Sequence, residues 1–298
     1  PGVRRRALGM TKDGDAEPQK PKKESLGKRV IAYCGNNAIQ IDADYAKKKL
    51  LEVSPLLLQE GEVIEMAFKM ERDHFYFTSK RLLFRDKKGV SGQRVEYVSV
   101  PYRAIQGYQV VTPGAMLDFS SELDIWSSGM DTIRMGFAKE KCDIFAVQMY
   151  FSRKLLAPGV VDPGQVEVCQ PGAEAKASQA SCSLLDYLGD NARQVNAPEF
   201  EARLKREPAV LEQDEKVLLA FRVLRDCTLF TSKRLLIIDV QGFSGKRVAY
   251  RSVLWKSIRA FGVESAGGMF DRDAELFVWT GISSYRRIKQ DLRKDSAD

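Results

Sequence analysis

The stretch FTSKRLL occupies residues 77–83 and recurs unchanged at residues 230–236, a shift of 153 residues. The same shift aligns Gly114 with Gly267 and Trp126 with Trp279, and the alignment runs without a gap from residue 62 to residue 126. Chance similarity does not hold one register over so long a stretch, so the match indicates a duplication. The chain is therefore predicted to contain two copies of one structural unit.

Each copy has the pattern of short antiparallel strands. In the first copy apolar and charged residues alternate from residue 64 onward, which places one set of side chains inward: Ile64, Met66, Phe68 and Met70. Glycine-containing turns at 88–89 and 91–92 separate further runs. The predicted strands lie at residues 64–70, 74–78, 81–86, 94–102, 105–112, 122–127 and 132–138.

Two helices are predicted to flank these strands. Asp42 or Asp44 is a candidate N-cap for a short helix that carries Tyr45, Leu50 and Leu51 toward a core. Residues 143–156 carry a helical apolar stripe made of Ile144, Val147, Phe151 and Leu155. The predicted unit is a seven-stranded barrel with one end closed by a helix.

Residues 158–183 have the composition of a flexible linker. They contain three Pro-Gly pairs and a stretch of Ala, Ser, Gln and Lys. We expect few contacts to cross this segment, so that the linker sets the separation of two rigid barrels.

The net charge of +7 resides mainly in the first 33 residues, where nine bases face four acids. The remaining chain is nearly neutral, which argues against a nucleic-acid-binding surface on the folded part. With almost no large apolar side chains, residues 1–33 are predicted to be a disordered basic tail. Its expected role is to dock on an acidic surface through Arg4, Arg5, Arg6, Lys20, Lys22 and Lys23.

No constellation of residues indicates catalysis, a cofactor or a metal. To bind zinc, several of the five scattered cysteines and the single histidine would have to converge from distant positions. The thiols are better interpreted as idle in a reducing compartment. The cysteines are Cys34, Cys142, Cys169, Cys182 and Cys227. His74 has Cys227 at its repeat position and is interpreted as a strand residue rather than a base. Phosphate loops, nucleophile elbows and carboxylate dyads are absent from the sequence.

The ordered motifs resemble the bacterial pleckstrin-homology (PH) domain family. In the first copy they are GEVIEMAFK at 61–69, FTSKRL at 77–82, SVPY at 99–102 and ELDIW at 122–126. The resemblance covers residues 34–157 and 184–298. It implies two bent seven-stranded barrels, mainly antiparallel β with flanking helices, and no known catalytic activity. Some members of that family form ring-like homo-oligomers.

The second copy departs from this pattern at its end. Residues 286–294 read as a final strand, and the sequence stops at Asp298, where the closing helix would begin. We therefore expect an open barrel end between residues 249–253 and 275–280, occupied by further native sequence or by another subunit. Ala249 and Glu275 are the candidate contacts there.

Two recurring motifs each allow two interpretations. The TSKR motif is either an anion site or a hairpin turn whose hydroxyls bond local backbone, and the turn is favoured. Its residues are retained as candidate partner contacts: Thr78, Lys80, Arg81, Thr231, Lys233 and Arg234. Trp126 and Trp279 are either exposed anchors or barrel core, and core is favoured because each lies on an alternating strand.

The leading functional hypothesis is a non-catalytic scaffold subunit that joins protein partners, with homo-oligomerisation left open. The alternative is a peripheral membrane adaptor whose tail binds anionic lipid. Loops 71–73 and 224–226 are too short and too balanced in charge to cradle an inositol phosphate. No apolar run is long enough to span a membrane, so membrane contact is peripheral at most. The basic start PGVRRR is compatible with an organellar precursor cut after import and equally with a truncation.

Overall fold

The computed structural model describes residues 38–156 and 192–293, with short gaps at 72, 89–93, 115–119, 139, 243 and 265–272. The basic tail and the predicted linker lie outside the described residues. The first copy contains β1 (Ile39–Ile41), α1 (Ala43–Val53), β2 (Ile64–Met70), β3 (Asp73–Thr78), β4 (Arg81–Lys88), β5 (Arg94–Pro101), β6 (Ile105–Val111), β7 (Ser121–Ser127), β8 (Ile133–Phe137) and α2 (Ile144–Leu155). The second contains β9 (Arg193–Gln194), α3 (Ala197–Arg206), β10 (Val217–Val223), β11 (Asp226–Thr231), β12 (Arg234–Gln241), β13 (Arg247–Leu254), β14 (Ile258–Glu264), β15 (Asp273–Thr280) and β16 (Arg287–Arg293).

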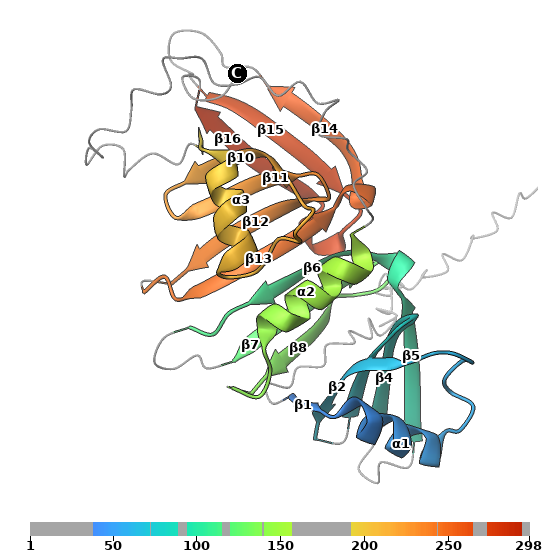
Figure 1. Cartoon of the computed structure of the whole chain (residues 1–298). Coiled ribbons are helices and arrows are strands. Elements are labelled where there is room, and N and C mark those ends of the chain that lie inside the picture. Colours follow the sequence, from blue (N-terminus) through green and yellow to red (C-terminus); the bar gives the residue numbers. More distant parts are fainter. Residues whose placement is uncertain are drawn as a thin grey trace, which may run out of the picture.

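The first copy is a barrel of two sheets closed by a helix, as predicted. Strands β1 to β5 form one antiparallel sheet, and β6 to β8 form the second. Helix α2 begins after Asp143, whose side chain accepts hydrogen bonds from the backbone N–H groups of Phe145 and Ala146. Its residues Val147 and Phe151 are fully buried, and Figure 1 shows the helix lying against β6, β7 and β8. The apolar stripe read from the sequence is therefore the face that fills the barrel.

Helix α1 covers the outer face of the first sheet. Asp42 caps it by accepting a hydrogen bond from the N–H of Tyr45 at 2.7 Å. The helix buries Ala46 and Leu50 against a small cluster on the sheet that includes Ala67, Tyr76 and Leu83. The prediction that Tyr45 points into a core is wrong, because this residue is 56% exposed.

Strand β2 does not keep one face inward along its whole length. Its pairing with β3 shifts register between Ile64 and Met66, which marks a β-bulge. Ile64 consequently packs in the cluster beneath α1, whereas Phe68 and Met70 face the barrel core. The expected single inward row is wrong at Ile64, because a bulge changes the parity of the alternation.

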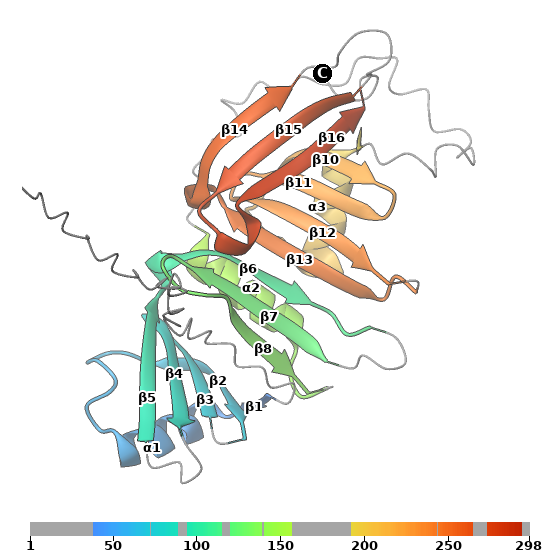
Figure 2. The same ribbon diagram turned by 180° about the vertical axis from the view of Figure 1, so that it is seen from behind.

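The second copy repeats this plan without a closing helix among the described residues. Strands β9 to β13 carry α3 on one face, and β14, β15 and β16 form a separate sheet on the other face (Figure 2). Asn196 caps α3 because its side chain accepts a hydrogen bond from the backbone N–H of Glu199. Leu204 is the buried residue of that helix. The strand predicted at 286–294 is present as β16.

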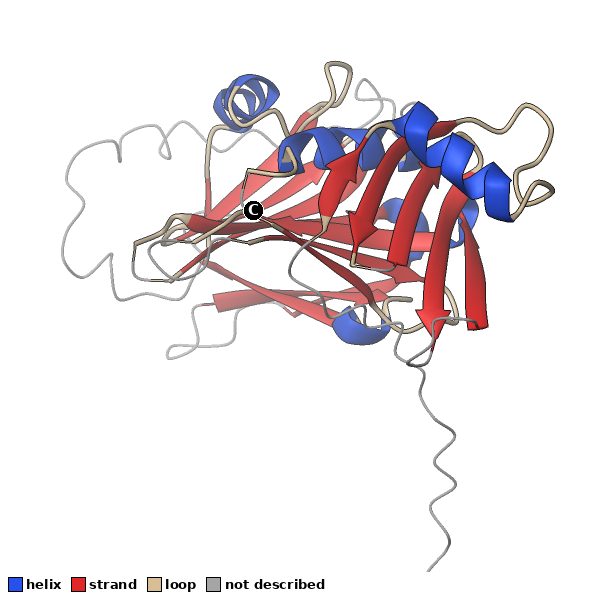
Figure 3. Cartoon of the chain, turned by 90° about the horizontal axis from the view of Figure 1, so that it is seen from below, coloured by secondary structure: helices blue, strands red, loops and turns tan. Residues whose placement is uncertain are grey.

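One sheet runs through both copies. Strand β6 of the first copy pairs antiparallel with β13 of the second, giving the order β8-β7-β6-β13-β12-β11-β10-β9. Val111 lies opposite Ala249 and Gly107 opposite Val253. Helices α2 and α3 share one face of this sheet, and Figure 3 shows the longer helices along one side of the strands. The expectation that a linker sets the separation of the barrels is wrong, because backbone hydrogen bonds join them directly.

Gly107 explains why the two backbones can approach so closely. A Cβ atom at this position would lie 2.7 Å from the carbonyl oxygen of Ser252 and 3.2 Å from the Trp126 ring. Such distances lie inside van der Waals contact, so only glycine fits without displacement of the strand.

The two repeated tryptophans have different environments. Trp126 is 3% exposed, but it packs against Leu235, Val253 and Ile282 of the second copy rather than inside its own barrel. Trp279 is 38% exposed. The predicted burial is therefore confirmed for Trp126, although the second copy supplies its contacts, and the core interpretation is wrong for Trp279, which lies near the surface.

Candidate partner-binding surface

The TSKR motif closes a hairpin in each copy. In the first, the hydroxyl of Thr78 accepts hydrogen bonds from the N–H groups of Lys80 and Arg81, and it donates to Glu62 at 2.7 Å. The guanidinium of Arg81 binds the same carboxylate at 2.9 Å. Burial would raise the pKa of Glu62, but the hydrogen bonds from Arg81, from the Gln59 N–H and from Thr78 outweigh it and lower the pKa to about 2. The motif has the local bonding that the hairpin interpretation requires.

The second copy buries the same arrangement completely. Arg234 and Glu215 pair at 3.0 Å with both side chains 0% exposed. Arg234 also donates to the hydroxyls of Ser252 and of Tyr108, the latter in the first copy, at 2.8 and 2.7 Å. Burial alone would lower the pKa of Arg234, but the adjacent Glu215 carboxylate outweighs it and raises the pKa. This charge is satisfied by structural partners and is inaccessible from the surface.

The structure does not gather the residues singled out from the sequence into one surface. The six basic tail residues lie outside the described part of the chain. Thr231, Lys233 and Arg234 are buried, and Lys233 pairs with Glu212 at 2.6 Å. Their burial leaves them no surface for a partner, so their role is to hold the hairpin.

The two contacts expected at the open barrel end are also engaged within the chain. Ala249 is fully buried and lies opposite Val111 in the joint sheet. Glu275 pairs with Lys289 at 2.7 Å. Residues 249–253 are therefore covered by the first copy and are not the exposed part of the second barrel.

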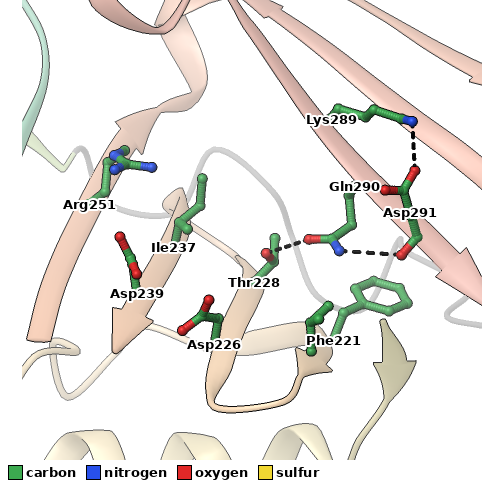
Figure 4. A pocket seen from close by; sticks show the side chains of 10 residues that line it. Phe221, Asp226, Thr228, Ile237, Asp239, Arg251, Lys289, Gln290 and Asp291 are labelled. Carbon is green, nitrogen blue, oxygen red and sulfur yellow. Dashed lines mark hydrogen bonds and ion pairs between the residues drawn. The ribbon is translucent and has the colours of Figure 1, made fainter. Parts of the chain in front are cut away.

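The interior of the second copy is polar at two positions where that of the first is apolar. Phe75 is replaced by Thr228 at the shift of 153, and Met135, which pairs with Leu123, is replaced by Gln290, which pairs with Leu276. Figure 4 shows these two replacement side chains joined across the interior, with Thr228 donating to Gln290 at 2.7 Å. They line an open hollow of about 300 Å³ between the two sheets. The second barrel therefore has a hydrogen-bonded polar pair and a hollow where the first is filled by apolar side chains.

Helix α2 determines what is covered in the first copy. Tyr108 and Val110 on β6 are both 0% exposed. The Tyr108 ring lies 5.2 Å from that of Phe151, and its hydroxyl is 2.9 Å from that of Ser152. This helix therefore removes one face of β6 from water.

In the second copy, none of the described residues covers the corresponding face of β14 to the same extent. Phe261 and Val263 occupy the repeat positions of Tyr108 and Val110, and they are 76% and 70% exposed. An exposed phenylalanine beside an exposed valine on one strand face is the apolar feature that most resembles an interaction surface here. Sequence reasoning missed both residues, although the repeat alignment pairs them with residues beneath the closing helix. We call Phe261 and Val263 the β14 patch.

The described residues contain no group of three or more potential metal ligands. Burial raises the pKa of Cys142 to about 12 and also raises that of Cys227, which disfavours reactive thiolates. His74 lies on β3 with its ring stacked on that of Tyr76 at 5.9 Å. No helix in the described ranges is long and apolar enough to cross a membrane.

A comparison with known protein families agrees with this duplicated barrel fold. The profile of the bacterial PH domain matches residues 34–155 and 184–297. The chain therefore belongs to the bacterial PH-domain family, in which it is a tandem protein. The family's bacterial character gives no support to the organelle expected from the basic start.

Similar proteins match one copy at a time. The chain is 35% identical over 114 residues to the uncharacterized protein YjqA of Bacillus subtilis, covering 38% of this chain and 88% of that protein. It is 34% identical over 99 residues to the uncharacterized protein YozO of the same organism, covering 33% and 83%. A crystal structure of a pleckstrin-homology protein from Shewanella loihica is 32% identical with a TM-score of 0.35, covering 41% of this chain and all of that one. A pleckstrin-homology domain from Shewanella amazonensis is 35% identical with a TM-score of 0.32, covering 39% and 90%.

Proposed function

We propose that this chain is a non-catalytic assembly subunit that binds a protein partner through the uncovered face of its second copy. The observation that carries the proposal is the contrast between Tyr108 and Phe261, which occupy one repeat position but are 0% and 76% exposed. Exposed apolar side chains at a position that the fold otherwise covers are typical of a surface that becomes buried in a complex.

The joint between the copies supports a scaffold role. The β6–β13 pairing is reinforced by side chains, with Arg247 bound to Glu122 at 2.9 Å and Arg251 donating to Gln109 at 3.0 Å. A partner bound to β14 is thereby held in a fixed relation to the first copy. A continuous sheet transmits position more rigidly than a flexible connection does.

A second copy of the chain is a less suitable partner for β14 than a different protein. Strands β5 and β14 lie at sheet edges and correspond to the paired strands β13 and β6. However, Ala260 occupies the position of Gly107, where a Cβ atom meets the opposing backbone. If β14 paired with β5 of a second chain in the register of β6 and β13, Glu96 would lie opposite Glu264. Like charges directly opposite each other destabilise a strand pair.

The proposal is tested by a photo-crosslinking amino acid at position 261 of the full chain, in the cells that make it. Leu56, which is 96% exposed on the first copy, provides the matched control position. We expect a discrete protein adduct at 261 and none at 56. The purified partner should bind the unmodified chain and should lose that binding when Phe261→Asp is introduced.

Two outcomes would contradict the proposal. Equal adducts at 261 and 56 would mean that the β14 patch is ordinary surface. Binding of the full chain to anionic vesicles that disappears on deletion of residues 1–33, with no protein adduct at 261, would favour the membrane adaptor instead.

A further inference from the structure

Four side chains form the platform on which α2 rests in the first copy. Phe77 and Tyr108 lie 5.4 and 5.2 Å, ring to ring, from Phe151 of the helix. The hydroxyl of Tyr102 lies 2.6 Å from that of Tyr150. Glu65 pairs with Lys154, in the last turn of the helix, at 2.6 Å. These residues, Glu65, Phe77, Tyr102 and Tyr108, are here called the α2 platform.

The second copy has an equivalent platform without the helix in the described part of the chain. The shift of 153 gives its members as Leu218, Phe230, Trp255 and Phe261. The rings of Phe230 and Trp255 stack at 6.3 Å. The Trp255 indole N–H donates to the carbonyl of Thr231 at 3.2 Å, just as the Tyr102 hydroxyl donates to the carbonyl of Thr78 at 2.7 Å. The local geometry that receives a helix is therefore retained.

We infer that this second platform binds an amphipathic helix of a partner protein, in the position that α2 occupies on the first copy. The inference rests on the proposed function and names the element that the partner contributes. Helix-in-groove binding buries apolar side chains spaced three and four residues apart, as Val147 and Phe151 are on α2. Such side chains would cover Phe261 and Val263 together.

The replacement of Glu65 by Leu218 determines the chemistry of the helix. On the first copy the carboxylate of Glu65 accepts hydrogen bonds from Lys154 and from the hydroxyl of Tyr150. Leu218 can accept neither, and a lysine buried beside it would lose its hydration without gaining a partner. The partner helix should therefore carry apolar residues at both corresponding positions.

The chain supplies its own probe in the peptide of residues 143–156, which contains α2. A second peptide carries the changes Tyr150→Phe and Lys154→Leu, which remove the two polar groups that Glu65 binds and Leu218 cannot. Both are titrated into the isotope-labelled full chain, and the backbone amide signals are followed by NMR. A helix this short is marginal in free solution, so dissociation constants of micromolar to millimolar order are expected.

We expect the doubly changed peptide to bind about three to ten times more tightly than the unchanged one, since it removes an unpaired charge from an apolar contact. Shifts should centre on residues 218, 230, 255 and 261–263. Phe261→Asp and Val263→Asp should each abolish binding, while Leu56→Asp should leave it unchanged. Retained dispersion in the spectra of the variants separates lost binding from lost folding.

The inference is overturned if neither peptide shifts these signals, or if Phe261→Asp leaves the binding unchanged. It is also overturned if the peptides fail and Phe261→Asp instead reduces binding to anionic vesicles, because the patch would then contact lipid. A protein adduct at position 261 together with failure of both peptides would reject the helix while leaving the proposed function intact.

Discussion

The guanidinium of Arg234 donates a 2.7 Å hydrogen bond to the hydroxyl of Tyr108, and this bond crosses from the second copy to the first. Both side chains are 0% exposed. The same hydroxyl lies within hydrogen-bonding distance of Ser152 and accepts from Gln148 of helix α2. A single oxygen atom thus links the hairpin of one copy to the closing helix of the other.

Removal of that oxygen should destabilise the whole chain. Tyr108→Phe would take one acceptor from Arg234 and leave buried groups of α2 short of a partner, which should cost about 1–3 kcal/mol. The free energy of unfolding in urea is the measurement. Tyr45→Phe, which alters an exposed ring on α1, is the matched control and should change it by less than about 0.5 kcal/mol. Equal effects from the two variants would contradict the role given to Tyr108.

The repeated tryptophans should respond differently to truncation. Trp126→Ala would empty the site between Leu235, Val253 and Ile282 and should cost about 3–5 kcal/mol. Trp279→Ala removes a partly exposed ring and should cost less than about 1 kcal/mol. Both are measured by urea denaturation of the full chain. Similar losses would mean that the two residues have equivalent environments after all.

Gly107→Ala should weaken the joint between the copies. The added methyl group would meet the carbonyl oxygen of Ser252 at 2.7 Å, and such overpacking should cost about 1–3 kcal/mol. Hydrogen exchange at the amides of residues 107–111 and 249–253 reports on the joint directly and should accelerate. The reciprocal change Ala260→Gly on β14 is the control and should leave hydrogen exchange at the joint unchanged. If Gly107→Ala also leaves the exchange rates at the joint unchanged, the steric argument is refuted.

Glu62 should contribute to the stability of the chain above about pH 4.5 and lose that contribution in acid. Its pKa of about 2 in the folded protein lies below the ordinary 4.5, so the folded state holds the ionised form more strongly than the unfolded chain does. Stability should therefore fall as the pH drops from about 4.5 toward 2. In Glu62→Gln this part of the fall should be absent. The free energy of unfolding of this variant at neutral pH should be about 1–3 kcal/mol lower than that of the unchanged chain.

Urea midpoints at pH 6 and pH 3 measure this effect. Glu52→Gln, which alters an exposed glutamate paired with Lys49 on α1, serves as the matched control. If the acid-induced loss in Glu62→Gln equals that in the unchanged chain, the pairing of Glu62 with Arg81 does not govern the acid response.

Much of each copy could be predicted because its determinants are local. Alternation along 64–70, the capping aspartates at 42 and 143, and the hydroxyl of Thr78 act through neighbours a few residues away. Even so, the bulge after Ile64 escaped prediction, because parity along a strand depends on its partner's register. The β14 patch escaped because exposure depends on what covers a strand.

The sequence by itself determined the duplication, the order of the strands, the closing helix of the first copy and the turn chemistry of both hairpins. The tertiary structure alone decided that β6 pairs with β13, that Trp126 is buried by the other copy while Trp279 is not, and that Phe261 faces water. Corresponding segments of the two copies have different outcomes, because strand edges and side-chain burial are set by contacts between residues more than a hundred positions apart.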